Sequence, residues 1–282
     1  MAAKSHRRNK VGSRGKKRHP GLPSSKTLSM VDLFLFLLDS RIPETSLQIA
    51  EPYLSKTNRV YVLTKPDLAD PEVTYAWLKQ FREQGAPAFA VECNTGRGVY
   101  ELMAYLKRQQ ASTLDKSHPE LLSRPLRVML FGVPNVGKSS LANRLLGTSK
   151  AAFGARPGLT RGSHWLRRGQ LEILDTPGVI DTSQAKGDVL YKLAATWAVR
   201  ETQYDEEEVA SWLAKEVFGK DDPIAHINEF GRSRGLLGPG GRVDFNQASK
   251  AFIQSFREGK FGRISIEAPD TQTPHAESQG LE

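Results

Sequence analysis

Short apolar runs alternate with amphipathic stretches along the first two thirds of the chain. Nearly every position is apolar in residues 31–38, 60–63, 88–91, 126–131 and 171–174. Apolar side chains recur at helical spacing between these runs, in residues 45–54, 72–84, 98–109 and 138–146. Runs of this length are typical of strands, and the period of the intervening segments is typical of helices. The alternation predicts a parallel sheet with helices covering both faces.

The pattern changes near residue 187, where strand-like runs stop. The segments that follow carry helical spacing only, in residues 188–200, 206–218, 224–232 and 247–258. We therefore predict a basic arm (1–29), an α/β domain (30–182), a helical domain (187–267) and a loose tail (268–282). The polar stretch 110–125 has no sustained period and is interpreted as a tether inside the α/β domain. The expected fold is a doubly wound, mainly parallel sheet followed by a small all-helical domain.

Composition and charge exclude a disordered protein and indicate what the basic arm binds. Hydrophobic residues make up 39% and charged residues 25%, which excludes wholesale disorder. The net charge of +9 is concentrated in residues 1–26, which hold nine Lys or Arg and no acid. Such an arm is expected to be disordered when alone and to make salt-sensitive contacts with a polyanion.

The cysteine content and the longest apolar run indicate where in the cell the protein is located. The single cysteine, Cys93, excludes an internal disulfide and suits a reducing compartment. Residues 30–38 include Asp32 and fall short of the roughly 20 residues that a membrane-spanning helix needs. We expect no membrane span and a cytoplasmic location. An organelle matrix is the less favoured alternative, suggested by the acid-free basic arm.

The strongest chemical signal is the sequence GVPNVGKSS at residues 132–140, which follows one apolar run and opens a helix. This pattern is typical of a phosphate-binding loop, in which backbone N–H groups and a helix N-terminus surround phosphates. Lys138 is expected to reach the β- and γ-phosphates, and the Ser139 hydroxyl to ligate Mg²⁺. The predicted nucleotide contacts here are Asn135, Val136, Gly137, Lys138, Ser139 and Ser140.

Two further segments fit the same chemistry. Asp175, at the end of the run 171–174, is predicted to hold Mg²⁺ through water, and Gly178 to offer its N–H to the γ-phosphate. Thr160, in the glycine-containing segment 156–162, is predicted to close over Mg²⁺ when the γ-phosphate is present. The alternative for each segment is an ordinary turn.

A base-reading element precedes the phosphate loop in the chain. Thr64, Lys65 and Asp67 belong to a TKPD sequence that ends the run 60–63. The Asp67 carboxylate is suited to accept hydrogen bonds from N1 and N2 of guanine, a donor pair that adenine lacks. Cys93 and Asn94 follow the run 88–91 and are expected to supply a backbone N–H to the guanine oxygen. The predicted ligands are GTP and GDP with Mg²⁺.

The order of these motifs, TKPD, ECNTG, GVPNVGKSS, GLTRG and DTPG, resembles a circularly permuted GTPase. With the DSRIP sequence at residues 39–43 and GKFGRISI at 259–266, the chain is similar to the YlqF/RbgA family. This resemblance implies a GTPase that binds a late precursor of the large ribosomal subunit and leaves after hydrolysis. It also implies that the helical domain contacts ribosomal RNA, and the candidate cations for that contact are Arg232, Arg234, Arg242, Lys250, Arg257, Lys260 and Arg263.

Several departures from the family pattern concern the catalyst. Thr64 replaces the usual Asn, and Cys93 a common Ser. Val179 and Ile180 stand where related enzymes carry a water-orienting Gln. No GHM-type motif precedes residue 31, which leaves His19 as a catalytic candidate or a solvated side chain. Slow intrinsic turnover, stimulated by the partner, is therefore expected.

Asn135 resembles an asparagine that holds K⁺ in several assembly GTPases, where K⁺ replaces an arginine finger. The alternative is that Asn135 only shapes the loop. Two other functions also stay open, a GTP-regulated RNA-binding module without catalysis and a GTPase coupled to RNA modification. The absence of heptads favours a monomer.

Overall fold

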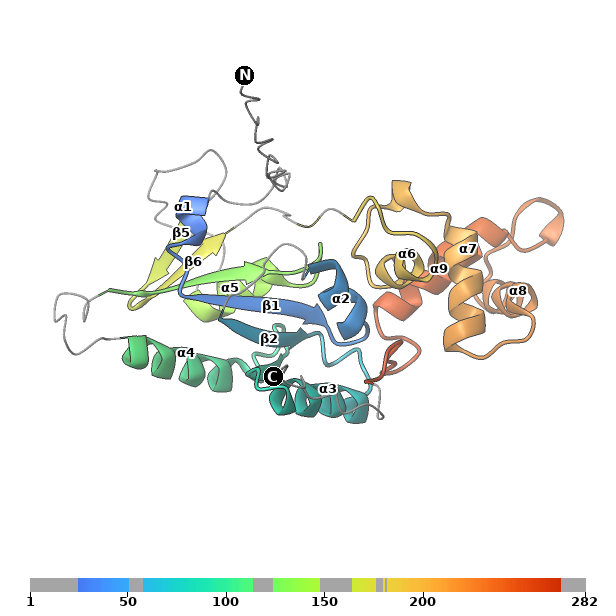
Figure 1. The fold of residues 1–282 in the computed structure, drawn as a ribbon. Coiled ribbons are helices and arrows are strands. Elements are labelled where there is room, and N and C mark those ends of the chain that lie inside the picture. Colours follow the sequence, from blue (N-terminus) through green and yellow to red (C-terminus); the bar gives the residue numbers. More distant parts are fainter. Residues whose placement is uncertain are drawn as a thin grey trace, which may run out of the picture.

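The computed structural model describes residues 25–50, 58–113, 124–147, 164–175, 180 and 182–269. Its centre is a six-stranded sheet in the order β3-β2-β1-β4-β6-β5 (Figure 1). The strands are β1 (Leu33–Asp39), β2 (Arg59–Thr64), β3 (Ala88–Val91), β4 (Leu126–Phe131), β5 (His164–Arg168) and β6 (Leu171–Asp175). Neighbouring strands are parallel except β5, which pairs antiparallel with β6 at the edge.

Four helices connect successive strands as the sequence pattern predicts, and they are α2 (Pro43–Ala50), α3 (Pro71–Glu83), α4 (Val99–Thr113) and α5 (Lys138–Leu146). The short helix α1 (Ser25–Leu28) precedes β1 and lies in residues 1–29, which were expected to form a disordered arm. The start of α3 is set locally, because the Asp70 carboxylate accepts hydrogen bonds from the N–H groups of Glu72 and Val73. Pro71 occupies the first helical position, where its missing N–H has no partner to lose.

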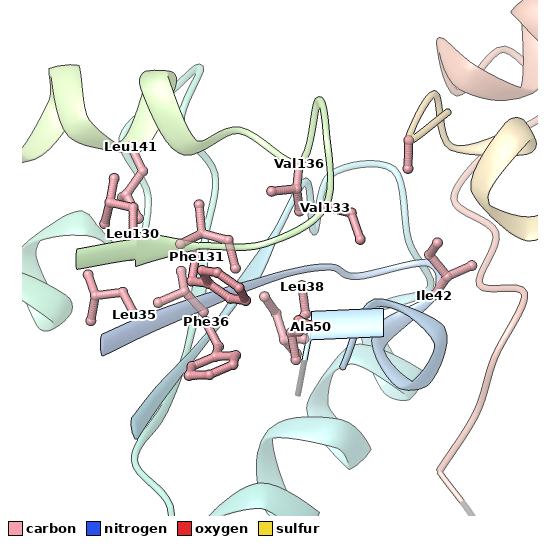
Figure 2. Close-up of a cluster of buried hydrophobic side chains, with 14 of the residues drawn as sticks. Leu35, Phe36, Leu38, Ile42, Ala50, Leu130, Phe131, Val133, Val136 and Leu141 are labelled. Atoms are coloured by element: carbon pink, nitrogen blue, oxygen red, sulfur yellow. The ribbon is translucent and has the colours of Figure 1, made fainter. Parts of the chain in front are cut away.

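The hydrophobic core is formed by the two central strands, β1 and β4, together with the segments that pack against them. All seven residues of β1 are buried, and the Phe36 and Phe131 ring centroids lie 5.6 Å apart across β1 and β4. Figure 2 shows Val133 and Val136, from the loop after β4, in the same apolar cluster. The loop is therefore anchored to the core by its own side chains, which fixes its position relative to the sheet.

The strand order creates one switch point. The chain runs outward from β1 to β2 and β3 and returns to the centre at β4. It then passes to the edge strand β5 and turns back into β6, which lies between β5 and β4. In the β1–β4 pair, Phe36 lies opposite Phe131, so the carboxyl ends of both central strands reach the same edge. Open α/β sheets bind ligands at such a point, beyond the carboxyl ends of the strands.

The remaining helices form a group at the end of the sheet toward which β1 points (Figure 1). They are α6 (Gly187–Ala195), η3 (Glu201–Gln203), α7 (Glu206–Trp212), η4 (Leu213–Val217), α8 (Pro223–Ser233), η5 (Pro239–Gly241) and α9 (Phe245–Arg257). Their centre includes edge-to-face contacts of Phe218 with Phe252 and Phe261, at centroid distances of 5.5 and 5.0 Å. Among the described residues, none of the helices is long and apolar enough to cross a membrane.

The doubly wound, mainly parallel sheet and the helical region after it are confirmed, with three local differences. β5 was not predicted, because its charged residues Arg167 and Arg168 hide the apolar alternation expected of an edge strand. The helix expected at 188–200 ends at Ala195, because Trp197 adopts the left-handed region with φ 70°. Helix α4 continues to Thr113, into the expected tether. The basic arm up to residue 24, tether residues 114–123 and residues 270–282 lie outside the described ranges.

Candidate functional site

The loop between β4 and α5 requires glycine at two positions. A Cβ atom on Gly132 would lie 2.5 Å from the Leu37 carbonyl oxygen on the neighbouring strand. Gly137 caps α5 with φ 107°, which side-chain-bearing residues rarely adopt. These glycines let the loop turn tightly over the end of β1 and enter the helix directly.

The positive charge of this loop comes from Lys138 and the N-terminus of α5. Lys138 is the first residue of α5, and its Nζ donates to the carbonyl oxygens of Gly132, at 2.9 Å, and Val133, at 2.8 Å. The ammonium group therefore lies within the loop, beside the partial positive charge of the helix N-terminus. Ser139 and Ser140, in the first turn of α5, are exposed. This combination of glycines, lysine and helix N-terminus suits a phosphate group.

The residues predicted to hold Mg²⁺ approach the same edge from two elements. Asp175 ends β6, which pairs with β4 in a register that places Leu174 opposite Met129. Ser139 is the second residue of α5, the helix that follows β4. Because β4 and β6 are parallel, Ser139 follows and Asp175 ends a strand at the same edge of the sheet. Oxygen ligands of these types suit Mg²⁺, which usually binds few protein groups and keeps several waters.

Three of the predicted catalytic residues, His19, Thr160 and Gly178, lie outside the described residues, and so does Val179, which stands where related enzymes carry Gln. Ile180, the residue after Val179, is only 4% exposed and belongs to the apolar core. An apolar side chain cannot orient water, so Ile180 does not replace the glutamine of related enzymes.

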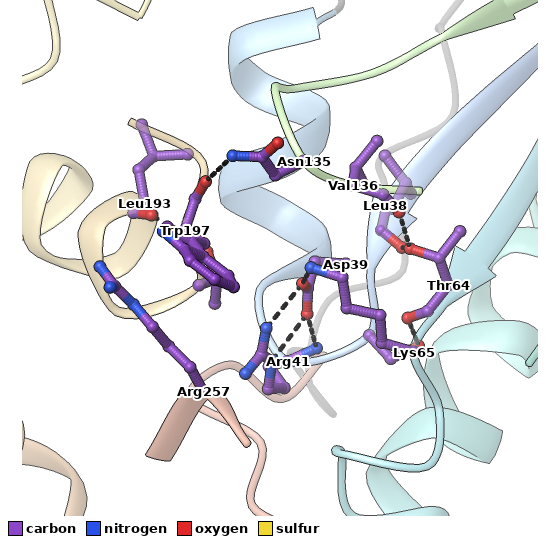
Figure 3. A network of polar contacts seen from close by, with 12 residues as sticks. Leu38, Asp39, Arg41, Thr64, Lys65, Asn135, Val136, Leu193, Trp197 and Arg257 are labelled. Carbon is purple, nitrogen blue, oxygen red and sulfur yellow. Dashed lines mark hydrogen bonds and ion pairs between the residues drawn. The ribbon is translucent and has the colours of Figure 1, made fainter. Parts of the chain in front are cut away.

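The base-reading loop contacts the phosphate loop directly. The Thr64 hydroxyl donates to the carbonyl oxygen of Val136 at 2.7 Å, joining residues 72 positions apart in the chain (Figure 3). Thr64 is buried, and its Cβ lies about van der Waals distance, 4.0 Å, from a Cβ built on Gly137. The threonine that replaces the usual asparagine therefore makes a bond between the two loops.

Lys65 is held by a buried ion cluster that motif reasoning did not assign to the site. Its Nζ lies 2.9 Å from Asp39 Oδ2, and the Arg41 guanidinium also bonds both carboxylate oxygens at 2.9 Å (Figure 3). Arg41 is 1% exposed. Burial raises the pKa of Asp39, but Arg41 and Lys65 outweigh this and hold the pKa well below its ordinary value. The sequence signal was the DSRIP sequence at residues 39–43, which begins at the end of a buried strand and supported the family resemblance without indicating an ion cluster.

The loop after β3 is tied to the phosphate-loop helix. Arg144, on α5, donates through Nε to the Cys93 carbonyl oxygen and through Nη2 to that of Asn94. Burial raises the pKa of the Cys93 thiol; Arg144 lowers it and the nearby Asp67 carboxylate raises it further. The Asp67 carboxylate therefore acts electrostatically on the loop that carries Cys93. Sequence reasoning missed Arg144, which carries no motif.

Asn135 faces the helical region. It adopts φ 54°, and its Nδ2 donates to the Trp197 carbonyl oxygen at 2.8 Å (Figure 3). The Arg257 guanidinium lies 5.3 Å from the centroid of the Trp197 ring. In this orientation the bond uses the amide nitrogen and leaves the amide oxygen to other ligands.

Five of the seven cations proposed for RNA contact divide into two groups, and the other two, Lys250 and Lys260, are exposed and pair with Glu206 and Glu258. Arg232, Arg234 and Arg242 are exposed, and the Arg234 guanidinium lies 4.6 Å from the Phe230 ring centroid. Arg257 instead donates to the Ala194 carbonyl and the Tyr204 hydroxyl oxygens, and Arg263 to carbonyls of the base-reading loop. The second group therefore has structural contacts inside the protein.

Comparison with known proteins agrees with this geometry. The family model of the 50S ribosome-binding GTPase matches residues 127–222, which begin after the base-reading loops. Ribosome biogenesis GTPase A of Bacillus licheniformis is 32% identical over 264 residues, covering 87% of this chain and 93% of that protein. The Priestia megaterium protein of the same name is 30% identical, covering 87% and 92%.

Two solved structures share the fold. GNP-bound YlqF from T. maritima has a TM-score of 0.63 and 25% identity, covering 87% of this chain and 96% of that one. The GDP-bound TM YlqF structure has a TM-score of 0.66 at 24% identity, covering 87% and 98%. Because the similarity extends over both the permuted sheet and the helical region, the chain belongs to the ribosome biogenesis GTPase A (YlqF/RbgA) family of GTP hydrolases.

Proposed function

We propose that this GTPase binds a precursor of the large ribosomal subunit, promotes a late step of its assembly and dissociates after GTP hydrolysis. Ribosomal RNA contacts are assigned to the exposed cations of the helical region and to the basic arm. Phosphate contacts of this kind bind strongly and with little sequence choice, so the helical surface has to supply selectivity. We further propose that the protein works in the cytoplasm as a monomer.

The observation that supports this proposal best is the bond between Thr64 Oγ1 and the Val136 carbonyl oxygen, at 2.7 Å. It joins the loop of the proposed guanine acceptor, Asp67, to the proposed phosphate loop, although their order in the chain is reversed. A guanine base and a triphosphate belonging to one nucleotide would then be bound at one sheet edge.

Each side chain has a distinct part in the proposed chemistry. Lys138 would neutralise charge on the β- and γ-phosphates, and the Asp67 carboxylate would accept the paired N–H donors of guanine. Ser139, Asp175 and Thr160 are the proposed Mg²⁺ ligands, and the ion would supply charge neutralisation between the phosphates. Gly178 would donate its backbone N–H to the γ-phosphate. His19 stays a candidate for water activation.

GTP hydrolysis by the purified protein should be slow and should rise on adding large ribosomal subunits. The physical reason is that Ile180 is buried and apolar, so the water-orienting group has to come from elsewhere. A partner that completes such a site accelerates hydrolysis by ~10³-fold or more. Phosphate release with GTP, with ATP as the control nucleotide, measures the effect.

The result also separates the alternatives. Stimulation by large subunits with GTP alone supports an assembly GTPase. GTP binding without turnover in the presence of the subunits would contradict the proposal and favour a regulated binding module.

Asn135 is proposed to bind K⁺ through Oδ1 while its Nδ2 is held by the Trp197 carbonyl. Hydrolysis should then be about tenfold faster in KCl than in NaCl at equal ionic strength, a fraction of an arginine finger's contribution. Asn135→Ala should remove the difference between the salts. Equal rates of the unaltered protein in both salts would eliminate Asn135 as a cation ligand.

A further inference from the structure

After α9 the chain returns to the sheet and runs along the base-reading loop (Figure 1). We call residues 263–267 the C-terminal strap. The Ile264 N–H donates to the Leu68 carbonyl oxygen at 3.0 Å, and the Ser265 hydroxyl accepts from the Asp70 N–H at 3.1 Å. The strap therefore bonds to the backbone on the carboxyl side of Asp67.

Arg263 extends this contact to both sides of Asp67. Its Nη2 donates to the Pro66 carbonyl oxygen at 2.9 Å, and its Nε to that of Ala69 at 3.1 Å. The planar guanidinium thus spans the turn that carries the Asp67 side chain. Two donors held in one rigid plane fix the spacing of the two carbonyls.

The base-reading loop is fixed at its two ends, where Lys65 pairs with Asp39 and the Asp70 carboxylate caps α3, and its middle has few internal bonds. Within residues 65–70, the Leu68 N–H donates to the Lys65 carbonyl oxygen at 3.0 Å. A loop with so few internal bonds depends on outside partners for its conformation, and here Arg263 and the rest of the strap are those partners.

The far end of the strap is anchored independently of Arg263. Glu267 is 6% exposed, and its carboxylate accepts from the Thr45 N–H at 3.1 Å and pairs with Lys192 Nζ at 3.1 Å. The N–H groups of Ile266 and Glu267 donate to the Arg41 carbonyl oxygen, at 2.9 and 3.1 Å. Removing the Arg263 side chain therefore leaves the strap attached and acts on the loop selectively.

From these contacts we propose that Arg263 is a positioning residue for guanine recognition. It holds Pro66 and Ala69 so that the carboxylate between them stays where the N1 and N2 donors of guanine meet it. Binding groups need placement to within ~0.5 Å to discriminate between ligands. The inference rests on the proposed function, since it takes Asp67 as the guanine acceptor.

The test uses the full-length protein and three variants, Arg263→Ala, Arg263→Lys and the charge-loss control Lys215→Ala. Lys215 is exposed on the helical region, and its Nζ lies 3.3 Å from Glu216 Oε1 in a pair whose two side chains are both exposed. Calorimetry measures the dissociation constants of GDP, ADP and inosine diphosphate, which lacks the N2 amino group. For Arg263→Ala, GDP affinity should fall about tenfold, the loss of a hydrogen-bond-sized interaction, and inosine diphosphate affinity should fall less.

The ratio of the two affinities is the decisive readout, because general destabilisation lowers both alike. The ratio should contract in Arg263→Ala, recover in part in Arg263→Lys, and stay unchanged in Lys215→Ala. Ser265→Ala removes only the acceptor for the Asp70 N–H and should shift the affinity ratio in the same direction. This variant replaces Arg263→Ala in the test if Arg263→Ala does not fold.

Two failures can be told apart. If the unaltered protein prefers GDP and the Arg263 and Ser265 variants keep its ratio, the positioning role is wrong while the proposed function stands. If the unaltered protein binds GDP, inosine diphosphate and ADP equally, the assignment of Asp67 is wrong, and this inference falls with it.

Discussion

Replacing Asp39 by alanine should lower the free energy of unfolding by ~3–5 kcal/mol, because it leaves a buried cation without its counter-charge. Arg41 is 1% exposed, and Asp39 accepts hydrogen bonds from its Nε and Nη2, at 2.9 Å each. Within the part of the chain that the structure describes, the Arg41 Nη1 already has no hydrogen-bond partner. Chemical denaturation, with an unchanged slope against denaturant, measures the difference.

Two variants control this prediction. The double change Asp39→Asn with Arg41→Met removes both charges and should recover much of the loss. Glu83→Gln breaks the surface pair of Lys79 and Glu83, at 3.8 Å, in which both side chains are about two-thirds exposed. It should cost less than ~1 kcal/mol. A loss in Asp39→Ala no larger than in Glu83→Gln would contradict the assignment.

The effect of Asp39 should also depend on pH in a defined direction. Arg41 and Lys65 hold the folded-state pKa of Asp39 below its ordinary value, near ~3.9 in an unfolded chain. The carboxylate therefore contributes its full stability above ~pH 4 and loses it as the pH falls toward the folded-state pKa. The stability gap between the unaltered protein and Asp39→Ala should be constant between pH 5 and 8 and should narrow in stronger acid.

Lys138→Ala should reduce subunit-stimulated GTP hydrolysis by ~10²–10³-fold, as expected for removal of one charged donor to the transferring phosphate. The Lys138 ammonium lies inside the phosphate loop, 2.9 Å from the Gly132 carbonyl oxygen. Loss of its bonds to that loop should also lower the free energy of unfolding, by ~1 kcal/mol. Single-turnover hydrolysis at saturating GTP measures the chemical step.

The matched control is Lys79→Ala, which removes a lysine that is 64% exposed on α3. It should hydrolyse GTP at the rate of the unaltered protein. A loss of less than about tenfold in Lys138→Ala would show that the phosphate charge is neutralised elsewhere.

The phosphate loop and the central strands were predictable because their signals are local. A Gly-rich sequence between an apolar strand and a helix needs only adjacent residues to be identified, and β4 and α5 occur at the expected positions. The same holds for Asp70, whose capping of α3 depends on the next three residues. The order of the motifs further indicated a permuted sheet, which the strand order confirms.

Other features could not be predicted from local pattern. Arginine is rarely buried, so composition gives Arg41 no interior role until the Asp39 carboxylate and the Phe256 ring surround it. Trp197 ends α6 in a conformation that usually selects glycine, and nothing in the helical period marks that stop. Arg263 resembled any other cation of a basic surface until its contacts placed it beside the base-reading loop.

The sequence by itself determined every strand except β5, most helices, the phosphate loop and the reversed motif order, because each depends on residues close together in the chain. The tertiary structure alone decided which loops meet. Thr64 joins Val136, Arg144 joins the loop after β3, and the strap reaches Pro66 and Ala69 across almost 200 positions, with separations of 197 and 194. Such contacts depend on how distant segments of the chain pack against one another, and local sequence propensities do not encode that packing.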